Sequence, residues 1–125
     1  MKRTKLIREF YESSYKQAIK ELITKQENLE WFWNEGDINE KKAKIYIVTD
    51  RGKFIKLELN KRKNKCLSEL IDLNDLSLEY EVESDKNSCL MIDWEAGSLW
   101  IWIEPDDLQT KRFVSFLLEN KFSKR

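Results

Sequence analysis

The chain has 125 residues, of which 41% are hydrophobic and 37% charged, and its 23 basic and 23 acidic side chains give zero formal net charge. A zero net charge gives no general attraction to the phosphates of nucleic acids. Histidine is absent, which excludes Ser-His, Cys-His and His-metal chemistry. The length is typical of one domain, so we expect residues 1–125 to fold as a single domain.

The amino-terminal residues and the cysteines indicate the cellular location. The start Met1–Lys5 is basic, but no apolar core of a signal peptide follows it. No apolar run approaches the roughly 20 residues that span a bilayer. Cys66 and Cys89 are the only cysteines and form no CxxC motif, so neither a disulfide framework nor a zinc site is predicted. We therefore expect a cytoplasmic protein without membrane contact, metal or cofactor.

The amino-terminal third has the spacing of a helix. Apolar side chains recur every three or four residues between Leu6 and Ile23, which places them on one helical face. Gln26 interrupts this stripe and marks a potential break. Gly36 can end the helix, because glycine tolerates the left-handed conformation. These patterns predict a long amino-terminal helix over residues 4–33.

Residues 43–59 have the pattern of a β-hairpin. Residues 43–49 are rich in β-branched side chains, and residues 53–59 alternate between apolar and polar. The intervening Asp50-Arg51-Gly52 suits a three-residue turn with positive φ at Gly52. One side of this hairpin carries Ile45, Ile47, Ile55 and Leu57, and the other carries Tyr46, Val48, Phe54 and Lys56.

The next segments are a basic loop over residues 60–65 and a stretch over residues 67–73 that fits either a short helix or an irregular link. Residues 76–83 then alternate strictly, as a half-exposed strand does. A second hairpin is predicted from residues 89–95 and 98–104 around Ala96-Gly97. In its expected register, Trp94 faces Leu99, Ile92 faces Ile101 and Leu90 faces Ile103.

Pro105 suits the first turn of a carboxy-terminal helix, with Asp106 and Asp107 at its positive end, and the helix should run to about Lys121. The complete order is helix, hairpin, link, strand, hairpin, helix. We therefore predict an α+β fold: an antiparallel sheet of about five strands (two hairpins plus one strand), with a long N-terminal helix and a C-terminal helix.

The predicted sheet has a second apolar face that mixes aromatic and acidic residues. It should carry Tyr46 and Phe54 from the first hairpin and Trp100 and Trp102 from the second. Either a helix covers this face, with residues 31–33 packed on it, or it stays partly open for a partner or for a homodimer. Tryptophan and tyrosine are frequent among the residues that dominate interface energies.

Charge is strongly segregated in spite of the zero total. Residues 69–107 contain twelve acids and a single base, Lys86, for a net charge of −11. This segment is either a solvated surface neutralised by bases elsewhere or an acidic docking surface for a basic protein. The predicted partner-binding residues share one sheet face or its border and are Glu79, Glu81, Glu83, Asp93, Glu95, Trp100 and Trp102.

No motif in the chain specifies a reaction, so we expect no catalytic residues and no enzyme. Chance pairs of carboxylates are expected in so acidic a segment, and no glycine-rich phosphate loop is present. The favoured function is that of a non-catalytic inhibitor or immunity-type protein that caps a basic toxin or nuclease. The alternative is a nucleic-acid-associated regulatory protein that uses the aromatic sheet face and the basic side chains of Lys61, Arg62, Lys63 and Lys65.

Overall fold

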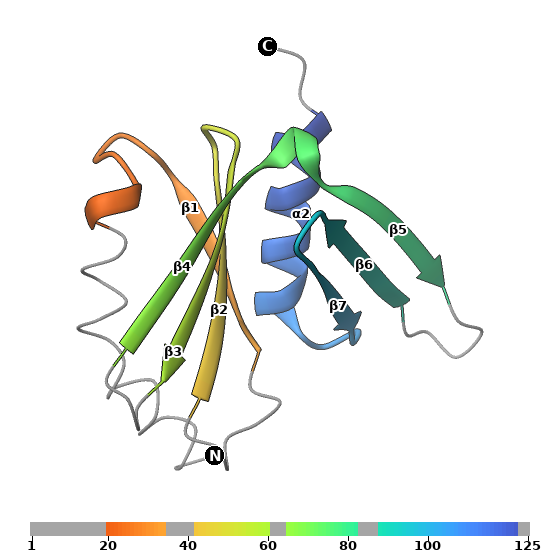
Figure 1. The fold of residues 1–125 in the computed structure, drawn as a ribbon. Coiled ribbons are helices and arrows are strands. Elements are labelled where there is room, and N and C mark those ends of the chain that lie inside the picture. The colour runs from red at the N-terminus through yellow and green to blue at the C-terminus, as the bar shows by residue number, and fades with distance from the viewer. Residues whose placement is uncertain (1–19, 35–41, 61–64, 83–87, 123–125) are drawn as a thin grey trace.

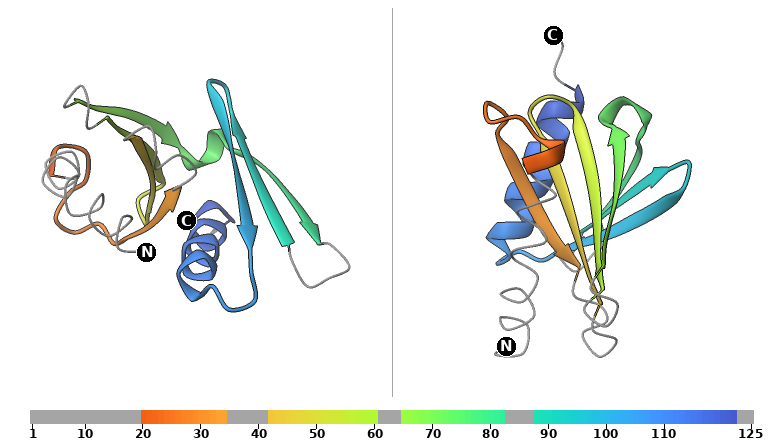
Figure 2. Two further views of the ribbon diagram at one scale, coloured as in Figure 1. Left: turned by 90° about the horizontal axis from the view of Figure 1, so that it is seen from below. Right: turned by 60° about the vertical axis from the view of Figure 1, so that its left-hand side comes forward.

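The computed structural model describes residues 20–34, 42–60, 65–82 and 88–122. These residues form two sheets, in each of which every strand pairs with the strands of that sheet that precede and follow it in sequence. The first sheet contains β1 (Leu29–Asn34), β2 (Lys42–Thr49), β3 (Lys53–Asn60) and β4 (Lys65–Asp72). The second contains β5 (Ser77–Val82), β6 (Ser88–Trp94) and β7 (Gly97–Ile103). The short 3-10 helix η2 (Leu73–Asp75) joins the sheets, and helix α2 (Leu108–Phe122) contacts both of them (Figures 1 and 2).

The predicted long amino-terminal helix is wrong. Of its expected span, residues 4–19 lie outside the described part, residues 20–22 are helical, and residues 29–34 form strand β1. In β1, Leu29 and Trp31 point to one side of the sheet and Glu30 and Phe32 to the other, and aromatic side chains are frequent in strands. The helical spacing of apolar residues before Gln26 led to the prediction that the helix continues through residues 29–33.

The count of about five strands is also wrong, because the described residues form seven strands in two sheets. Besides β1, the missed strand is β4, which covers most of the stretch left open between helix and link. Its sequence does not alternate clearly between apolar and polar residues. It is held by a full antiparallel ladder with β3, from Lys53 opposite Asp72 to Asn60 opposite Lys65. Pairing with β3, rather than the pattern of its own residues, therefore determines its structure.

The first hairpin is confirmed, including the positive φ of 82° at Gly52 in its turn. Both faces of the first sheet are buried at the centre of β2 and β3. Tyr46, Val48 and Phe54 point to the side that holds α2, which we call the core face. On the opposite side, β2 and β3 carry Ile45, Ile47, Ile55 and Leu57, each at most 1% exposed.

One apolar core joins the core face of the first sheet, the inner face of the second sheet and α2. Phe113 of α2 is fully buried, and its ring centroid lies 5.6 Å from that of Phe32 in β1. At the other end of the core, the sheets touch directly. The ring centroids of Trp94 and Phe54 lie 5.3 Å apart. The indole Nε1 of Trp94 donates a 2.7 Å hydrogen bond to the carboxylate of Glu69 in β4.

The second hairpin forms, but its register is shifted by two residues from the expected one. Its turn is Glu95-Ala96, so Gly97 is already opposite Trp94. Ile92 then pairs with Leu99, and Leu90 pairs with Ile101. Because a shift of two residues preserves the side on which each side chain points, the predicted division into faces survives.

Helix α2 begins at Leu108 rather than at Pro105, because Asp107 caps it. The Asp107 carboxylate accepts hydrogen bonds from the Thr110 amide at 3.1 Å and the Thr110 hydroxyl at 2.6 Å. These hydrogen bonds lower the pKa of Asp107 below its ordinary value, while partial burial opposes them.

Among the described residues, no helix is long and apolar enough to cross a membrane.

Candidate functional site

The outer face of the second sheet is defined by three rows of paired residues. Glu79, Met91 and Trp100 form the central row, because Met91 is opposite both of the others. Antiparallel residues that are directly opposite point to the same side. The nine positions of this outer face are Ser77, Glu79, Glu81, Cys89, Met91, Asp93, Ser98, Trp100 and Trp102.

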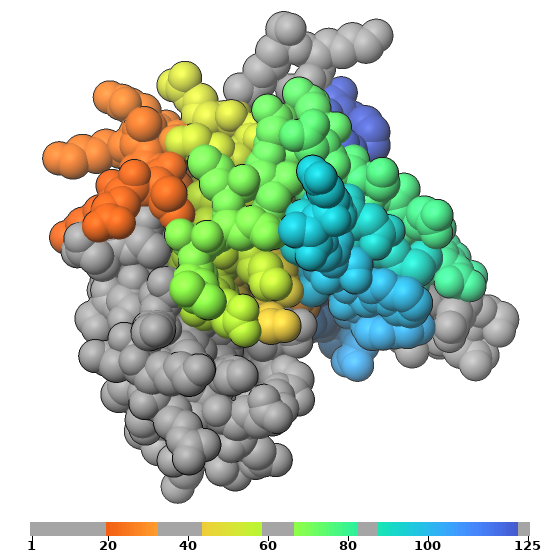
Figure 3. All heavy atoms as spheres, viewed as in Figure 1, coloured from red at the N-terminus to blue at the C-terminus, as the bar shows by residue number. Residues whose placement is uncertain are grey.

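The two tryptophans of the outer face are open to solvent. Trp100 is 59% exposed and Trp102 is 51% exposed, although both belong to a strand whose alternate residues are buried. No helix in the described part of the chain covers them. The second sheet forms the right-hand part of the molecular surface in Figure 3. Exposed indole rings on a regular strand are costly in water, which makes them candidates for contact with a partner.

The acids of the outer face lie on β5 and β6, on one side of these rings, and are also exposed. Glu79 and Glu81 lie on β5, and Asp93 lies on β6. Within the described residues they form no ion pair, and none of the nine positions is basic. Glu95 lies in the adjacent turn and is exposed, whereas Glu83 falls outside the described residues. Six of the seven predicted partner-binding residues therefore occupy this face or its border.

Other acids of the segment 69–107 have structural roles instead. Glu69 accepts the hydrogen bond from Trp94, and Asp107 caps α2. Asp72 accepts a 2.8 Å hydrogen bond from the amide of Asn74 and so caps η2. The segment of net charge −11 is consequently not one continuous docking surface, and the outer face holds only part of it.

The expected composition of the aromatic face is wrong. Tyr46 and Phe54 do not share a face with Trp100 and Trp102, because they belong to the other sheet and lie in the core at 2% and 0% exposure. Sequence parity assigns a side chain to one of two faces but does not say which strands share a sheet.

The side chains proposed for nucleic-acid contact lie outside the part of the chain that the structure describes. Lys61, Arg62 and Lys63 lie outside the described residues. Lys65 is the first residue of β4, and its side chain is not among those that the structure describes.

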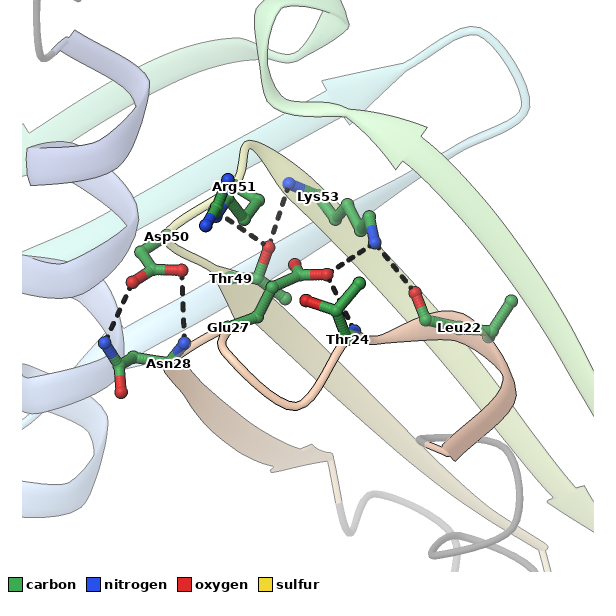
Figure 4. A network of polar contacts seen from close by, with 8 residues as sticks. All are labelled: Leu22, Thr24, Glu27, Asn28, Thr49, Asp50, Arg51 and Lys53. Atoms are coloured by element: carbon green, nitrogen blue, oxygen red, sulfur yellow. Dashed lines mark hydrogen bonds and ion pairs between the residues drawn. The ribbon is translucent and has the colours of Figure 1, made fainter.

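A partly buried ion pair joins residues 20–28 to the first hairpin, and no sequence motif predicts it (Figure 4). Lys53 Nζ lies 2.6 Å from Glu27 Oε1 and donates a second hydrogen bond to the Leu22 carbonyl at 2.9 Å. Burial raises the pKa of Glu27, but hydrogen bonds from Lys53, Thr24 and Thr49 outweigh it and lower this pKa to about 2. A carboxylate held ionised in this way cannot serve as a general acid near neutral pH, so the pair is structural.

An open groove lies between α2 and the inner face of the second sheet. Its volume is about 660 Å³, and apolar side chains of Tyr80, Ile103, Val114 and Leu118 line much of it. Lys111 also lines the groove, and its ammonium group donates to the Pro105 carbonyl. None of the described residues that line this groove is a tryptophan.

Among the ranges that the structure describes, no three Cys, Asp or Glu side chains gather as metal ligands would. Comparison of the chain with protein-family models, with curated proteins and with solved structures finds no match. The exposed tryptophans and acids of the outer face are therefore the features from which a function can be argued.

Proposed function

We propose that the chain is a non-catalytic protein-binding domain that caps a basic partner with the outer face of its second sheet. The most concrete form of this proposal is an inhibitor or immunity-type protein for a basic toxin or nuclease in the cytoplasm. The observation that carries it is the exposure of Trp100 and Trp102 beside three acids that have no basic neighbour on that face.

The two residue types on this face have complementary effects on association. Acids such as Glu81 and Asp93 attract a basic protein over a distance of about one Debye length and raise the rate of encounter. Tryptophan side chains are desolvated on contact and mainly slow dissociation. A nuclease presents a basic active site to its substrate, so an acidic surface with aromatic anchors complements it in both respects.

The alternative of a nucleic-acid-associated regulator has less support. Its stacking platform required Tyr46 and Phe54, which lie in the core. The remaining exposed rings, Trp100 and Trp102, stand among carboxylates that repel phosphates. A homodimer through the same face would bring Glu79, Glu81 and Asp93 of two copies together, which like-charge repulsion opposes.

The proposal is tested with purified basic toxins or nucleases, beginning with those encoded beside the gene for this chain. We expect a one-to-one complex that blocks the partner's activity and associates more slowly as salt concentration rises. Charge reversal by Glu81→Lys with Asp93→Lys should slow association about tenfold at low salt and flatten the salt dependence. Trp100→Ala should weaken the complex about thirtyfold, mainly through faster dissociation. Stopped-flow mixing measures both rates.

The matched control is Glu119→Lys, which reverses an exposed acid on α2 and leaves the outer face unchanged. This variant should keep the association rate of the unmodified chain within about twofold. If the control slows association as much as the outer-face variant does, general charge drives binding and the proposed surface is wrong. Turnover of a substrate that is lost on substitution of one outer-face acid would contradict the non-catalytic function.

A further inference from the structure

Strand β5 has a free hydrogen-bonding edge. Within the described residues it pairs with β6 alone, and it lies at the border of the second sheet in Figure 1. Of its six residues, only Leu78 is partly covered, and the other five are exposed. Every second amide and carbonyl of such an edge points away from the sheet and can pair with a strand from another chain.

The two sides of β5 present different chemistry. Glu79 and Glu81 belong to the acidic outer face. Tyr80 and Val82 point to the opposite side, where they are 57% and 68% exposed. Tyr80 is also part of the wall of the groove against α2, so the apolar strip along β5 continues into that groove. A strand that matches this edge should therefore alternate between basic and apolar side chains.

A second copy of the chain is a poor match for the same edge. If two β5 strands paired antiparallel about a centre at Tyr80, Glu79 of each copy would lie opposite Glu81 of the other. If the symmetry axis passed through Glu79 instead, Glu79 of one copy would lie opposite Glu79 of the other. Like charges directly opposite each other destabilise a strand pair. The acids thus oppose self-pairing while they favour a basic strand.

We propose that β5 binds an extended segment of the basic partner by strand addition, with Lys or Arg in alternation with apolar residues. This inference rests on the proposed function for the positive charge of the partner, and it adds the mode of recognition. A strand about 4.8 Å from β5 places its basic side chains beside Glu79 and Glu81 and its apolar ones beside Tyr80 and Val82. Backbone hydrogen bonds supply the alignment, and the acids select the charge.

The experiment uses the full chain labelled with ¹⁵N and a synthetic peptide of about ten residues that alternates Lys and Val. Amide hydrogen exchange should slow at every second residue of β5 when the peptide is present. Two peptides serve as probes of specificity: one with the same composition in two blocks, and one that alternates Glu and Val. Both should bind about tenfold more weakly than the alternating Lys-Val peptide.

Variants locate the site on the chain. Glu79→Lys with Glu81→Lys, and separately Tyr80→Ser, should each weaken binding of the Lys-Val peptide about tenfold or more. The matched control is Leu70→Ser, which removes a 53% exposed apolar side chain from β4 and should change the affinity less than twofold. A larger loss in the control would assign the peptide to β4 and overturn the proposal.

The remaining outcomes separate this inference from the proposed function. Peptide binding that leaves the β5 amides unprotected overturns strand addition, and equal binding of the blocked peptide does the same. The function of the outer face would still stand in either case if Trp100→Ala weakened the complex with a protein partner. In the converse outcome, the β5 amides are protected while Trp100→Ala leaves the affinity for the protein partner unchanged. That result would support strand addition and contradict the role of Trp100 as an anchor.

Discussion

At the scale of single residues, Glu27 should make the stability of the fold depend on pH. Its folded-state pKa of about 2 lies below the ordinary value of 4.5, so its ionised form stabilises the folded chain. This stabilisation is complete above about pH 4.5 and is lost as the pH falls toward 2. We expect Glu27→Gln to lower the free energy of unfolding by roughly 2–3 kcal/mol at pH 7 and to have little effect near pH 2. Urea titrations across this range measure the difference. The exposed Glu119→Gln is the control, and a Glu27→Gln effect that did not vary with pH would contradict the ion pair.

At the scale of elements, side chains on the two faces of strand β7 should differ in their effect on stability. Ile101 is fully buried, whereas its neighbour Trp100 is 59% exposed. Ile101→Ala should cost about 2–5 kcal/mol of unfolding free energy, because it leaves a cavity in the core. Trp100→Ala should cost less than about 1 kcal/mol and act on the partner complex instead. Thermal unfolding followed by circular dichroism distinguishes the two, and similar losses in both variants would show that the Trp100 side chain is part of the core.

The elements that were predicted from sequence are those whose pattern is local. The turn at Gly52, the alternation in β5 and the existence of helix α2, although not its first residue, are each set by residues close in the chain. The sequence pattern of β4 itself does not indicate a strand, and its structure follows from pairing with β3, such as Leu57 opposite Ser68. The division into two sheets is likewise not indicated by the pattern of any one strand. For the outer face, parity correctly placed Trp100 beside the acids but also grouped it with Phe54, because a period of two carries no information about which sheet a strand joins.

At the scale of the whole molecule, α2 should make the two sheets unfold as one unit. The helix buries Phe113 against Phe32 of the first sheet, and Val114 belongs to the same core as Ile101 of the second. Phe113→Ala should lower the free energy of unfolding by about 3–5 kcal/mol and shift all spectroscopic transitions together. Far-ultraviolet circular dichroism follows the backbone, and near-ultraviolet signals follow the tryptophans. Separate midpoints for the two signals would instead show that the sheets are independent domains.

The neighbour-to-neighbour order of the strands bears on how the chain folds. Every strand pair within the described residues joins segments that follow one another, so each hairpin can form before distant parts of the chain meet. Low sequence separation between contacts favours rapid folding. The contact of α2 with β1 is different, since the Gln109 side chain donates to the Trp31 carbonyl across a separation of 78 residues. Closing that long loop is the entropically costly step, and we expect docking of the helix, rather than assembly of either sheet, to limit the folding rate.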